Sequence, residues 1–123
     1  MPSLSQRKGQ RSESLALRYL TLKGYTIIAQ NHRSRLGEID IIAKEKDTIV
    51  FVEVKARSTE RFGTPKLAVT QQKQKKLSRL ALEYLKNHGK SYAKARFDVV
   101  AIVQHNSGMP EIELIKNAFN LAY

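Results

Sequence analysis

The residues with the clearest chemical potential lie in one stretch, residues 37–56, with the sequence GEIDIIAKEKDTIVFVEVKA. Two apolar runs of strand character, 39–43 and 48–54, flank a charged, turn-prone segment at 44–47, a pattern that predicts a β-hairpin. Side chains alternate between the two faces of a strand, so Glu38 and Asp40 should share one face, as should Glu53 and Lys55. Pairing of the strands would bring carboxylates and an ammonium within roughly 5 to 8 Å of each other. We therefore predict a metal site on this hairpin.

The same alternation predicts which side chains of the hairpin face a core. Ile39 and Ile41 should lie together on the face opposite Asp40. In the second strand Val52 and Val54 should point away from Glu53, toward a core. The hairpin would then have one apolar face and one face that carries the acids.

The donor types limit which metal such a site could hold. The chain has no cysteine, which excludes disulfides, thiolate zinc sites and a cysteine nucleophile. Oxygen ligands favour Mg²⁺ or Mn²⁺, which are commonly held by only one or two carboxylates. Asp40 and Glu53 suit that role, and the carbonyl of Val54 is a natural further ligand. Glu13 would complete the shell if its helix packs across the hairpin.

A site of this kind can hydrolyse a phosphodiester bond, because a bound metal can activate water and neutralise the charge that develops on phosphorus. Lys55 would orient the attacking water and stabilise negative charge. Burial or a nearby cation could lower the pKa of Lys55 enough for it to act as a base. Two alternatives stay open: the acids are ordinary surface carboxylates, and Glu13 forms a salt bridge with a neighbouring arginine.

The overall charge points to a polyanionic partner. The 123 residues carry a formal net charge of +11, an excess that indicates nucleic acid first and an anionic membrane surface second. The length and the absence of a composition break predict a single domain, residues 1–123. No apolar run approaches a membrane span and the N-terminus lacks a signal peptide, so we expect a cytoplasmic protein with no membrane association.

The elements that must position these residues can be predicted from periodicity and from turn residues. The expected segments are a helix at 5–23, a strand at 25–30, a basic loop at 31–36, the hairpin, a loop at 57–65, a helix from Thr70 to Gly89, strands at 96–103 and 111–115, and a last helical turn at 117–123. The order α-β-β-β-α-β-β favours an α/β (α+β) fold, with a small mixed sheet of about five strands flanked by helices.

Basic residues cluster on two of these elements. The second helix carries cations opposite its apolar face, a pattern that favours tracking of a phosphate backbone over an ordinary solvated face. The candidate nucleic-acid contacts are Arg33 and Arg35 of the basic loop, Arg57, Lys73, Lys76 and Arg79. Asp98, within the strand at 96–103, is expected to cap or to pair with a basic residue.

The acids and the lysine also carry a resemblance. Asp40, Glu53 and Lys55 match the three motif positions of the PD-(D/E)XK nucleases, which have the restriction-endonuclease-like fold. Glu13 resembles the additional helix acid of the archaeal Holliday-junction resolvases. The blocks GEIDIIA, FVEVKAR, FGTP, AVT with Lys73, and RFDVVAI resemble, in this order, the YraN-like family of predicted endonucleases over nearly the whole chain. Ser12 and His32 depart from that pattern, where glycine and tryptophan are common.

The leading hypothesis is a metal-dependent DNA endonuclease that acts on branched or recombining DNA. The alternative is a nucleic-acid-binding scaffold of the same fold that does not cut and serves in DNA processing. A third hypothesis is an adaptor whose basic face binds an acidic protein. The resemblance to resolvases implies a homodimer, and a protein partner in DNA processing is also compatible with it.

Overall fold

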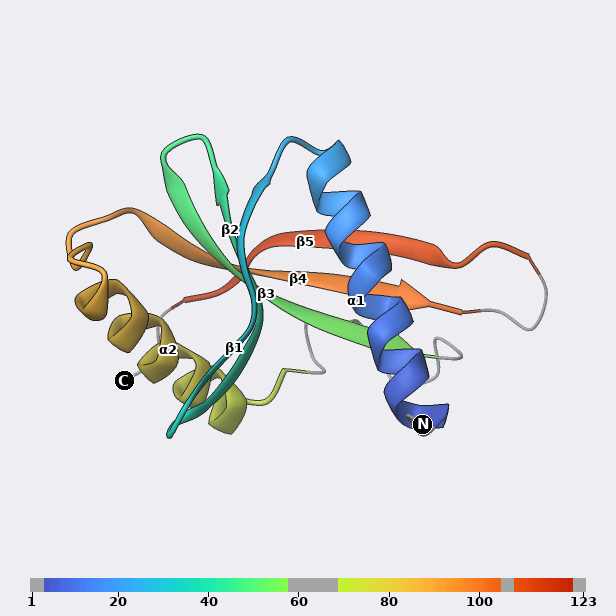
Figure 1. Cartoon of the computed structure of the whole chain (residues 1–123), viewed down its shortest axis with the longest axis horizontal. Coiled ribbons are helices and arrows are strands. Elements are labelled where there is room, and N and C mark those ends of the chain that lie inside the picture. The colour runs from blue at the N-terminus through green and yellow to red at the C-terminus, as the bar shows by residue number, and fades with distance from the viewer. Residues whose placement is uncertain (1–3, 58–68, 105–107, 121–123) are drawn as a thin grey trace.

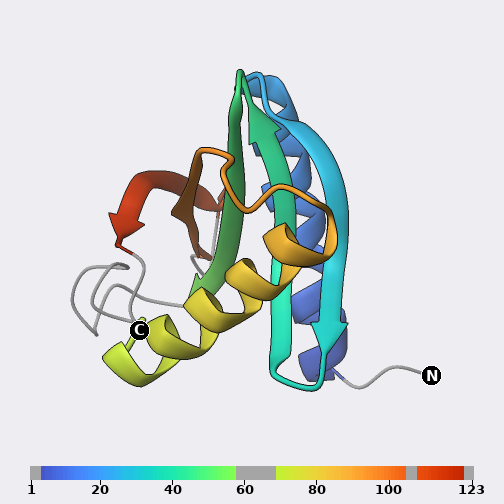
Figure 2. The same cartoon turned by 90° about the vertical axis from the view of Figure 1, so that its left-hand side faces the viewer.

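The computed structural model describes residues 4–57, 69–104 and 108–120, which form a five-stranded sheet with one helix on each face (Figure 1, Figure 2). The elements are α1 (Leu4–Leu22), β1 (Thr26–Ser34), β2 (Gly37–Glu45), β3 (Thr48–Arg57), α2 (Gln71–Asn87), β4 (Ala95–Val103) and β5 (Glu111–Phe119). The predicted fold class and element order are thus confirmed. The loop predicted at 57–65 lies, apart from Arg57, outside the described residues. Within the described ranges, neither helix has the length and apolar character needed to cross a bilayer.

The strands lie side by side in the order in which they occur in the chain. β3 and β4 are parallel, and the other neighbours are antiparallel. A parallel pair needs a crossover connection, and α2 lies in the connection between β3 and β4. The sheet is strongly twisted, so that β1 and β2 diverge from β3, β4 and β5 in Figure 1. This divergence creates the region in which the acids meet.

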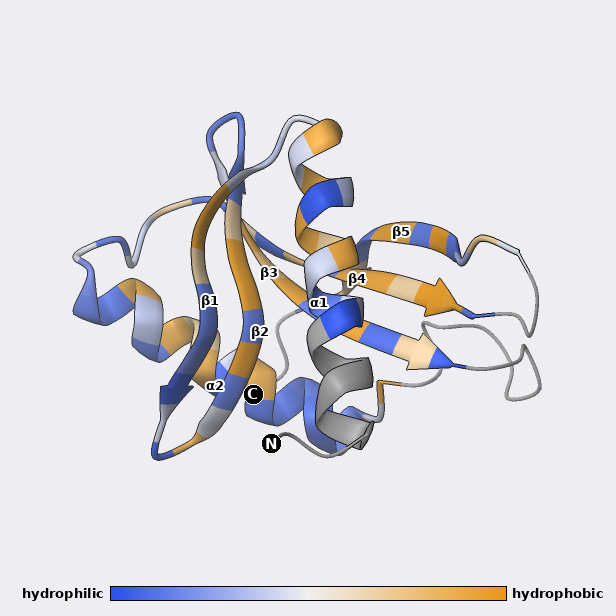
Figure 3. Cartoon of the chain, turned by 45° about the vertical axis from the view of Figure 1, so that its right-hand side comes forward, coloured by the Kyte–Doolittle hydropathy of each residue, from blue (hydrophilic) through white to orange (hydrophobic). Residues whose placement is uncertain are grey.

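Each face of the sheet is covered by one helix. α1 buries Ala16 and Leu20 against Val50 and Val52, whereas α2 packs against the opposite face, around Phe51. The residues that α2 buries are the predicted apolar set: Leu77, Leu80, Ala81, Tyr84 and Leu85. Figure 3 shows apolar residues along β2 and β4, and further apolar residues on both helices.

The helix boundaries follow from capping. Gly24 and Gly89, the predicted stops, have positive φ values of +96° and +64°. After α1, the amide of Tyr25 donates to the carbonyl of Leu20 at 3.0 Å, the bond expected when a left-handed residue ends a helix. Thr70 caps α2 as predicted, because its hydroxyl accepts from the amide of Lys73 at 3.2 Å.

Two predicted boundaries are wrong because polar edge strands resemble loops in sequence. The basic loop at 31–36 is mostly strand, since β1 continues to Ser34 and leaves only Arg35 and Leu36 between it and β2. The last helical turn at 117–123 is also wrong, since β5 continues to Phe119 and residues 121–123 are outside the described ranges. Phe119 stacks on Phe97 at 4.6 Å between ring centroids, which explains why β5 stays paired.

The predicted face of Ile39 is wrong as well. Ile39 belongs to the core under α2, together with Ile42, whereas Ile41 belongs to the core under α1. Regular alternation would put Ile39 and Ile41 on the same face. The regular alternation of side chains along β2 is therefore broken at Asp40. The ladder between β2 and β3 also ends there, since its last pair is Ile41 with Val52.

Asp98 has a structural role. It is fully buried, and its carboxylate accepts hydrogen bonds from the Tyr25 hydroxyl at 2.7 Å, from Arg96 Nε at 2.9 Å and from the amide of Asn117 at 3.0 Å. Arg96 also donates to Glu45 at 2.6 Å. The prediction that Asp98 pairs with a basic residue is confirmed, and the network connects the start of β1 with β2, β4 and β5.

We predict that Asp98→Ala lowers the free energy of unfolding by about 3–5 kcal/mol, because it removes the buried carboxylate that accepts hydrogen bonds from Arg96, Tyr25 and the amide of Asn117. Urea denaturation, monitored by circular dichroism, measures this loss. Asp47→Ala is the control, since the Asp47–Lys94 pair is exposed and its removal should leave the midpoint nearly unchanged. Equal midpoints for the two variants would contradict the structural role of Asp98.

Candidate metal centre

Asp40 lies where β2 and β3 separate, and it connects the two strands there. Its Oδ2 accepts a hydrogen bond from the amide of Val54 at 2.9 Å. The side chain thus continues the contact between the strands beyond the last backbone pair, Ile41 with Val52. The sequence predicts the carbonyl of Val54 as a further metal ligand, and the structure places the backbone of Val54 beside Asp40.

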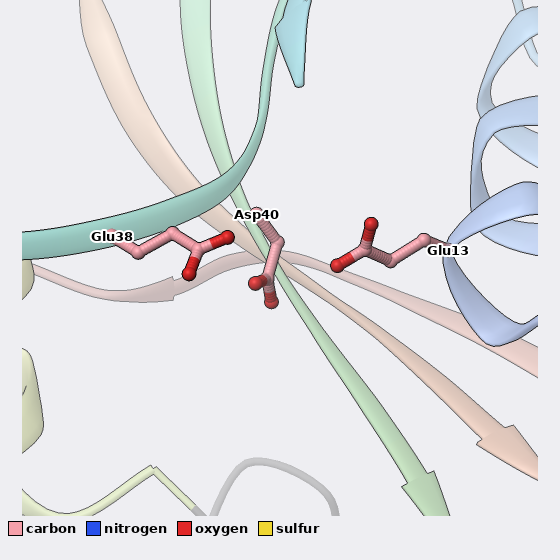
Figure 4. A group of neighbouring side chains, drawn as sticks. All are labelled: Glu13, Glu38 and Asp40. Carbon is pink, nitrogen blue, oxygen red and sulfur yellow. The ribbon is translucent and has the colours of Figure 1, made fainter. Parts of the chain in front are cut away.

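Three acids converge at this point. Glu13 from α1 and Glu38 and Asp40 from β2 each offer a carboxylate oxygen, and these oxygens lie within 4.8 Å of one another. Figure 4 shows the side chains of Glu38 and Glu13 reaching toward Asp40 from opposite sides. The predicted approach of Glu13 across the hairpin is therefore realised. Opposite ligands on one Mg²⁺ or Mn²⁺ ion are about 4 Å apart, so small side-chain rotations would let the three acids share a cation.

Glu38 is the acid that the sequence did not assign to the metal. The predicted set was Glu13, Asp40 and Glu53, but within the described residues the group of converging acids contains Glu38 in place of Glu53. The available signal was its spacing of two residues from Asp40, which puts both acids on one side of a strand. Arg33 lies 3.6 Å from Glu38, but the side chain of Arg33 is 77% exposed, so this pair is weak.

The surroundings of Glu13 raise its pKa and would favour a cation nearby. Burial raises the pKa of Glu13, and the charges of Asp40 and Glu38 raise it further, while a hydrogen bond with Asn31 opposes the shift. No salt bridge to Glu13 occurs among the described side chains, so an arginine partner has no support there. A divalent cation would relieve the repulsion that these carboxylates share.

Glu53 lies beside this cluster and is engaged by other groups. Its side chain is 8% exposed, and Lys73 Nζ lies 3.3 Å from Glu53 Oε1. Burial raises the pKa of Glu53, as do a hydrogen bond with Asp40 and the charge of that residue, whereas Lys73 and Lys55 lower it. The net effect is a raised pKa of Glu53, because burial and the nearby charge of Asp40 both disfavour the charged form of Glu53. The predicted neighbourhood of Asp40, Glu53 and Lys55 is therefore present.

The two lysines differ in electrostatic state. Burial lowers the pKa of Lys55, and the charge of Lys73 lowers it further, although Glu53 opposes this shift. Burial also disfavours the charged form of Lys73, but the charge of Glu53 and hydrogen bonds with Lys55 and Glu53 outweigh it, so the pKa of Lys73 is raised. Lys73, predicted on the exposed face of its helix, is instead half-buried and reaches the sheet.

The other predicted nucleic-acid contacts lie on α2, in the β1–β2 turn and at the end of β3. Lys76 and Arg79 are exposed on α2, Arg35 is exposed in the β1–β2 turn, and Arg57 ends β3. Lys76 crosses close to Gly37: a Cβ added at Gly37 would lie 2.7 Å from Lys76 Cε. The turn that carries Arg35 and the first half of α2 therefore lie together.

The two departures from the YraN-like pattern have different surroundings. Ser12, next to Glu13, is 2% exposed, and its hydroxyl has no hydrogen-bond partner among the described atoms. His32 lies edge-on to the ring of Tyr84, with 5.3 Å between centroids, and thus packs toward α2. The structure gives His32 a packing role.

Comparisons with known proteins agree on a family. The model of the family described as "Uncharacterised protein family UPF0102" matches residues 12–102. A UPF0102 protein of Desulfosudis oleivorans is 50% identical over 115 residues, which are 94% of this chain and 91% of that protein. A UPF0102 protein of Rhodococcus jostii is 47% identical over 111 residues, or 90% of this chain and 94% of that protein.

We predict that Mn²⁺ at 100 times its dissociation constant stabilises the wild type by about 2.7 kcal/mol, as expected for a ligand that binds only the folded state. Glu38→Gln should abolish most of this effect. In EDTA the same variant should be at least as stable as the wild type, because it removes a like charge from the cluster. Differential scanning calorimetry with Mn²⁺ and with EDTA measures both changes.

The control for this experiment is Glu113→Gln, which changes an exposed acid of β5. It should respond to Mn²⁺ as the wild type does. A Glu38→Gln protein that keeps the full Mn²⁺ stabilisation would exclude Glu38 from the centre.

Proposed function

This chain belongs to the UPF0102 family, and we propose that it is a Mg²⁺- or Mn²⁺-dependent endonuclease that hydrolyses phosphodiester bonds in DNA. The observation that carries the proposal is the convergence of Glu13, Glu38 and Asp40 beside Glu53 and Lys55. These acids gather in a chain whose formal net charge is +11. An acidic cluster would repel a polyanion unless a cation were bound there, and such a cation is what phosphodiester hydrolysis requires.

The acids have distinct tasks in this proposal. The oxygens of Glu13, Glu38 and Asp40 would hold the metal, and Glu53, next to Asp40, is the next acid within reach. Bound at this point, Mg²⁺ would supply Lewis-acid stabilisation of the phosphoryl oxygens and activation of water. Because Asp40 also accepts from the amide of Val54, its carboxylate is held between the strands in a fixed position.

Lys55 is the proposed group that handles the attacking water. It extends from β3 two residues beyond Glu53, on the same face of the strand. Its lowered pKa increases the fraction of neutral amine at neutral pH, which is the form that can accept a proton from water. In its charged form the same amine would stabilise the negative charge that develops on the phosphate. Both roles require it to lie at the metal centre.

Cations of α2, of the β1–β2 turn and of the end of β3 would hold the DNA backbone. Lys76 and Arg79 project from α2, while Arg35 lies in the turn beside it and Arg57 at the end of β3. Contacts of this type position a duplex and do not read its sequence. We therefore propose a substrate recognised by its backbone and shape, with branched DNA as the class to test first. A homodimer would suit such a substrate, because a junction presents two equivalent strands.

We predict Mg²⁺- or Mn²⁺-dependent cleavage in a panel of linear, flapped and four-way-junction DNAs. Asp40→Asn should reduce cleavage by at least about 100-fold, since it weakens both the metal site and the bond to Val54. Lys55→Ala should also reduce cleavage while leaving Mn²⁺ binding in place. Gel electrophoresis of end-labelled DNA measures the rates.

Asp47→Asn is the matched control for cleavage, because Asp47 lies in the β2–β3 turn, outside the acid cluster. Full cleavage by Asp40→Asn would overturn the proposed function. Tight, salt-sensitive DNA binding by the wild type with no cutting under any condition would favour the non-catalytic scaffold.

The basic surface gives a separate prediction on binding. For duplex DNA the logarithm of the binding constant falls with the logarithm of salt by about 0.9 per phosphate neutralised. Lys76→Ala should therefore weaken binding and reduce that slope by about 0.9. Fluorescence anisotropy at several salt concentrations in EDTA measures the slope. Lys46→Ala, in the β2–β3 turn, is the control that should leave it unchanged.

A further inference from the structure

Lys73 differs from the other cations of α2 in the contact that it makes. It is the third residue of the helix, where the Thr70 hydroxyl fixes its backbone amide at 3.2 Å. Its side chain is 40% exposed and reaches Glu53, whose side chain is 8% exposed, with 3.3 Å between Nζ and Oε1. Lys75 and Lys76, the next cations along the helix, are exposed. Lys73 is therefore directed at an acid of the centre from the helix side.

Lys73 contacts Glu53 at the edge of the group of converging acids, where Glu53 also hydrogen-bonds with Asp40. The carboxylate oxygens of Glu13, Glu38 and Asp40 lie within 4.8 Å of one another, and Glu53 is outside that described group. Lys73 and a divalent cation would compete for the same carboxylate oxygens of Glu53, because each needs the lone pairs and the negative charge of that group. While Lys73 holds Glu53, a metal at this point would have one strong ligand fewer.

We propose that Lys73 is a positioning residue that restrains Glu53 until a DNA phosphate takes over its ammonium. The inference rests on the proposed metal-dependent nuclease function. A phosphate that enters along the exposed cations of α2 meets Lys73 at the boundary between the helix and the centre. Pairing of Lys73 with that phosphate frees Glu53 for the metal, so the full set of ligands forms only when substrate is present.

The proposal requires that metal binding and DNA binding favour each other. DNA removes Lys73 from Glu53 and thereby raises metal affinity, and by linkage the metal must raise DNA affinity by the same factor. Replacing Lys73 by an uncharged residue removes the competition. The free protein would then bind metal more tightly, whereas the help that DNA gives to metal binding would shrink.

The first test measures the affinity of the DNA-free protein for Mn²⁺ by isothermal titration calorimetry. Lys73→Met should bind Mn²⁺ about tenfold more tightly than the wild type, because a unit charge only a few ångströms from the ligand is removed. Lys75→Met is the matched control, since it makes the same change of charge on the exposed side of α2 and should differ little from wild type. Lys73→Arg, which keeps the charge, should also stay near the wild type.

The second test uses DNA binding in EDTA, measured by fluorescence anisotropy with a four-way junction. Glu53→Gln should bind the junction several-fold more tightly than Glu83→Gln, because only the first change releases Lys73 for a phosphate. This test does not depend on the folding of the Lys73 variant. Equal affinities of the two glutamine variants would contradict the proposal.

The outcomes separate this inference from the proposed function. If the wild type binds no Mn²⁺, the metal centre itself is wrong. If the wild type binds Mn²⁺ and Lys73→Met binds it equally or more weakly, the metal centre stands and the restraint by Lys73 is overturned. Tighter binding by Lys73→Met and Lys75→Met alike would show a general charge effect, which also overturns it.

Discussion

The hydrogen bond from the amide of Val54 to Asp40 is the contact on which the rest of the centre depends. The backbone ladder between β2 and β3 ends at Ile41 and Val52, and beyond it the strands diverge. Without this contact, the amide of Val54, which lies beyond the end of the ladder with β2, would need another hydrogen-bond acceptor. Asp40 supplies the acceptor with a side chain whose remaining lone pairs face the other acids. A single carboxylate thus holds the strands together and takes part in the cluster.

The divergence of the strands also explains how two helices on opposite faces of a sheet can contribute to one centre. A continuous sheet would separate α1 from α2 by its own thickness. Where β2 leaves β3, Glu13 from the α1 side comes close to Asp40, and Lys73 from the α2 side comes close to Glu53. The change of facing between Ile39 and Ile41 belongs to the same distortion. The irregular backbone of β2 is therefore part of the site.

The sequence predicted the parts of the fold that depend on local chemistry. Gly24, Thr70 and Gly89 act at helix ends as short-range rules require, and the alternation in residues 37–56 placed Asp40 beside Glu53. The sequence did not predict that Glu38, in place of Glu53, would join Glu13 and Asp40 in the described group of acids. The reason is that local alternation cannot show where the ladder between two strands ends. The inward direction of Lys73 was missed for a similar reason. A lysine near the start of an amphipathic helix looks solvated until the strand that it meets is known.

The opposite pKa shifts of Glu53 and Lys55 have one principal cause, since burial disfavours the charged form of both an acid and a base. Burial therefore favours the neutral form of both side chains, while the charge of Lys73 opposes this effect at Glu53. A divalent cation at the proposed centre would change this balance, because its charge would favour an ionised Glu53 and disfavour an ionised Lys55. A neutral lysine beside a metal ligand can accept a proton from water, which a permanently charged arginine at position 55 could not do. The burial that makes this pair costly in the folded protein would also suit it to the proton transfer that the proposed function requires.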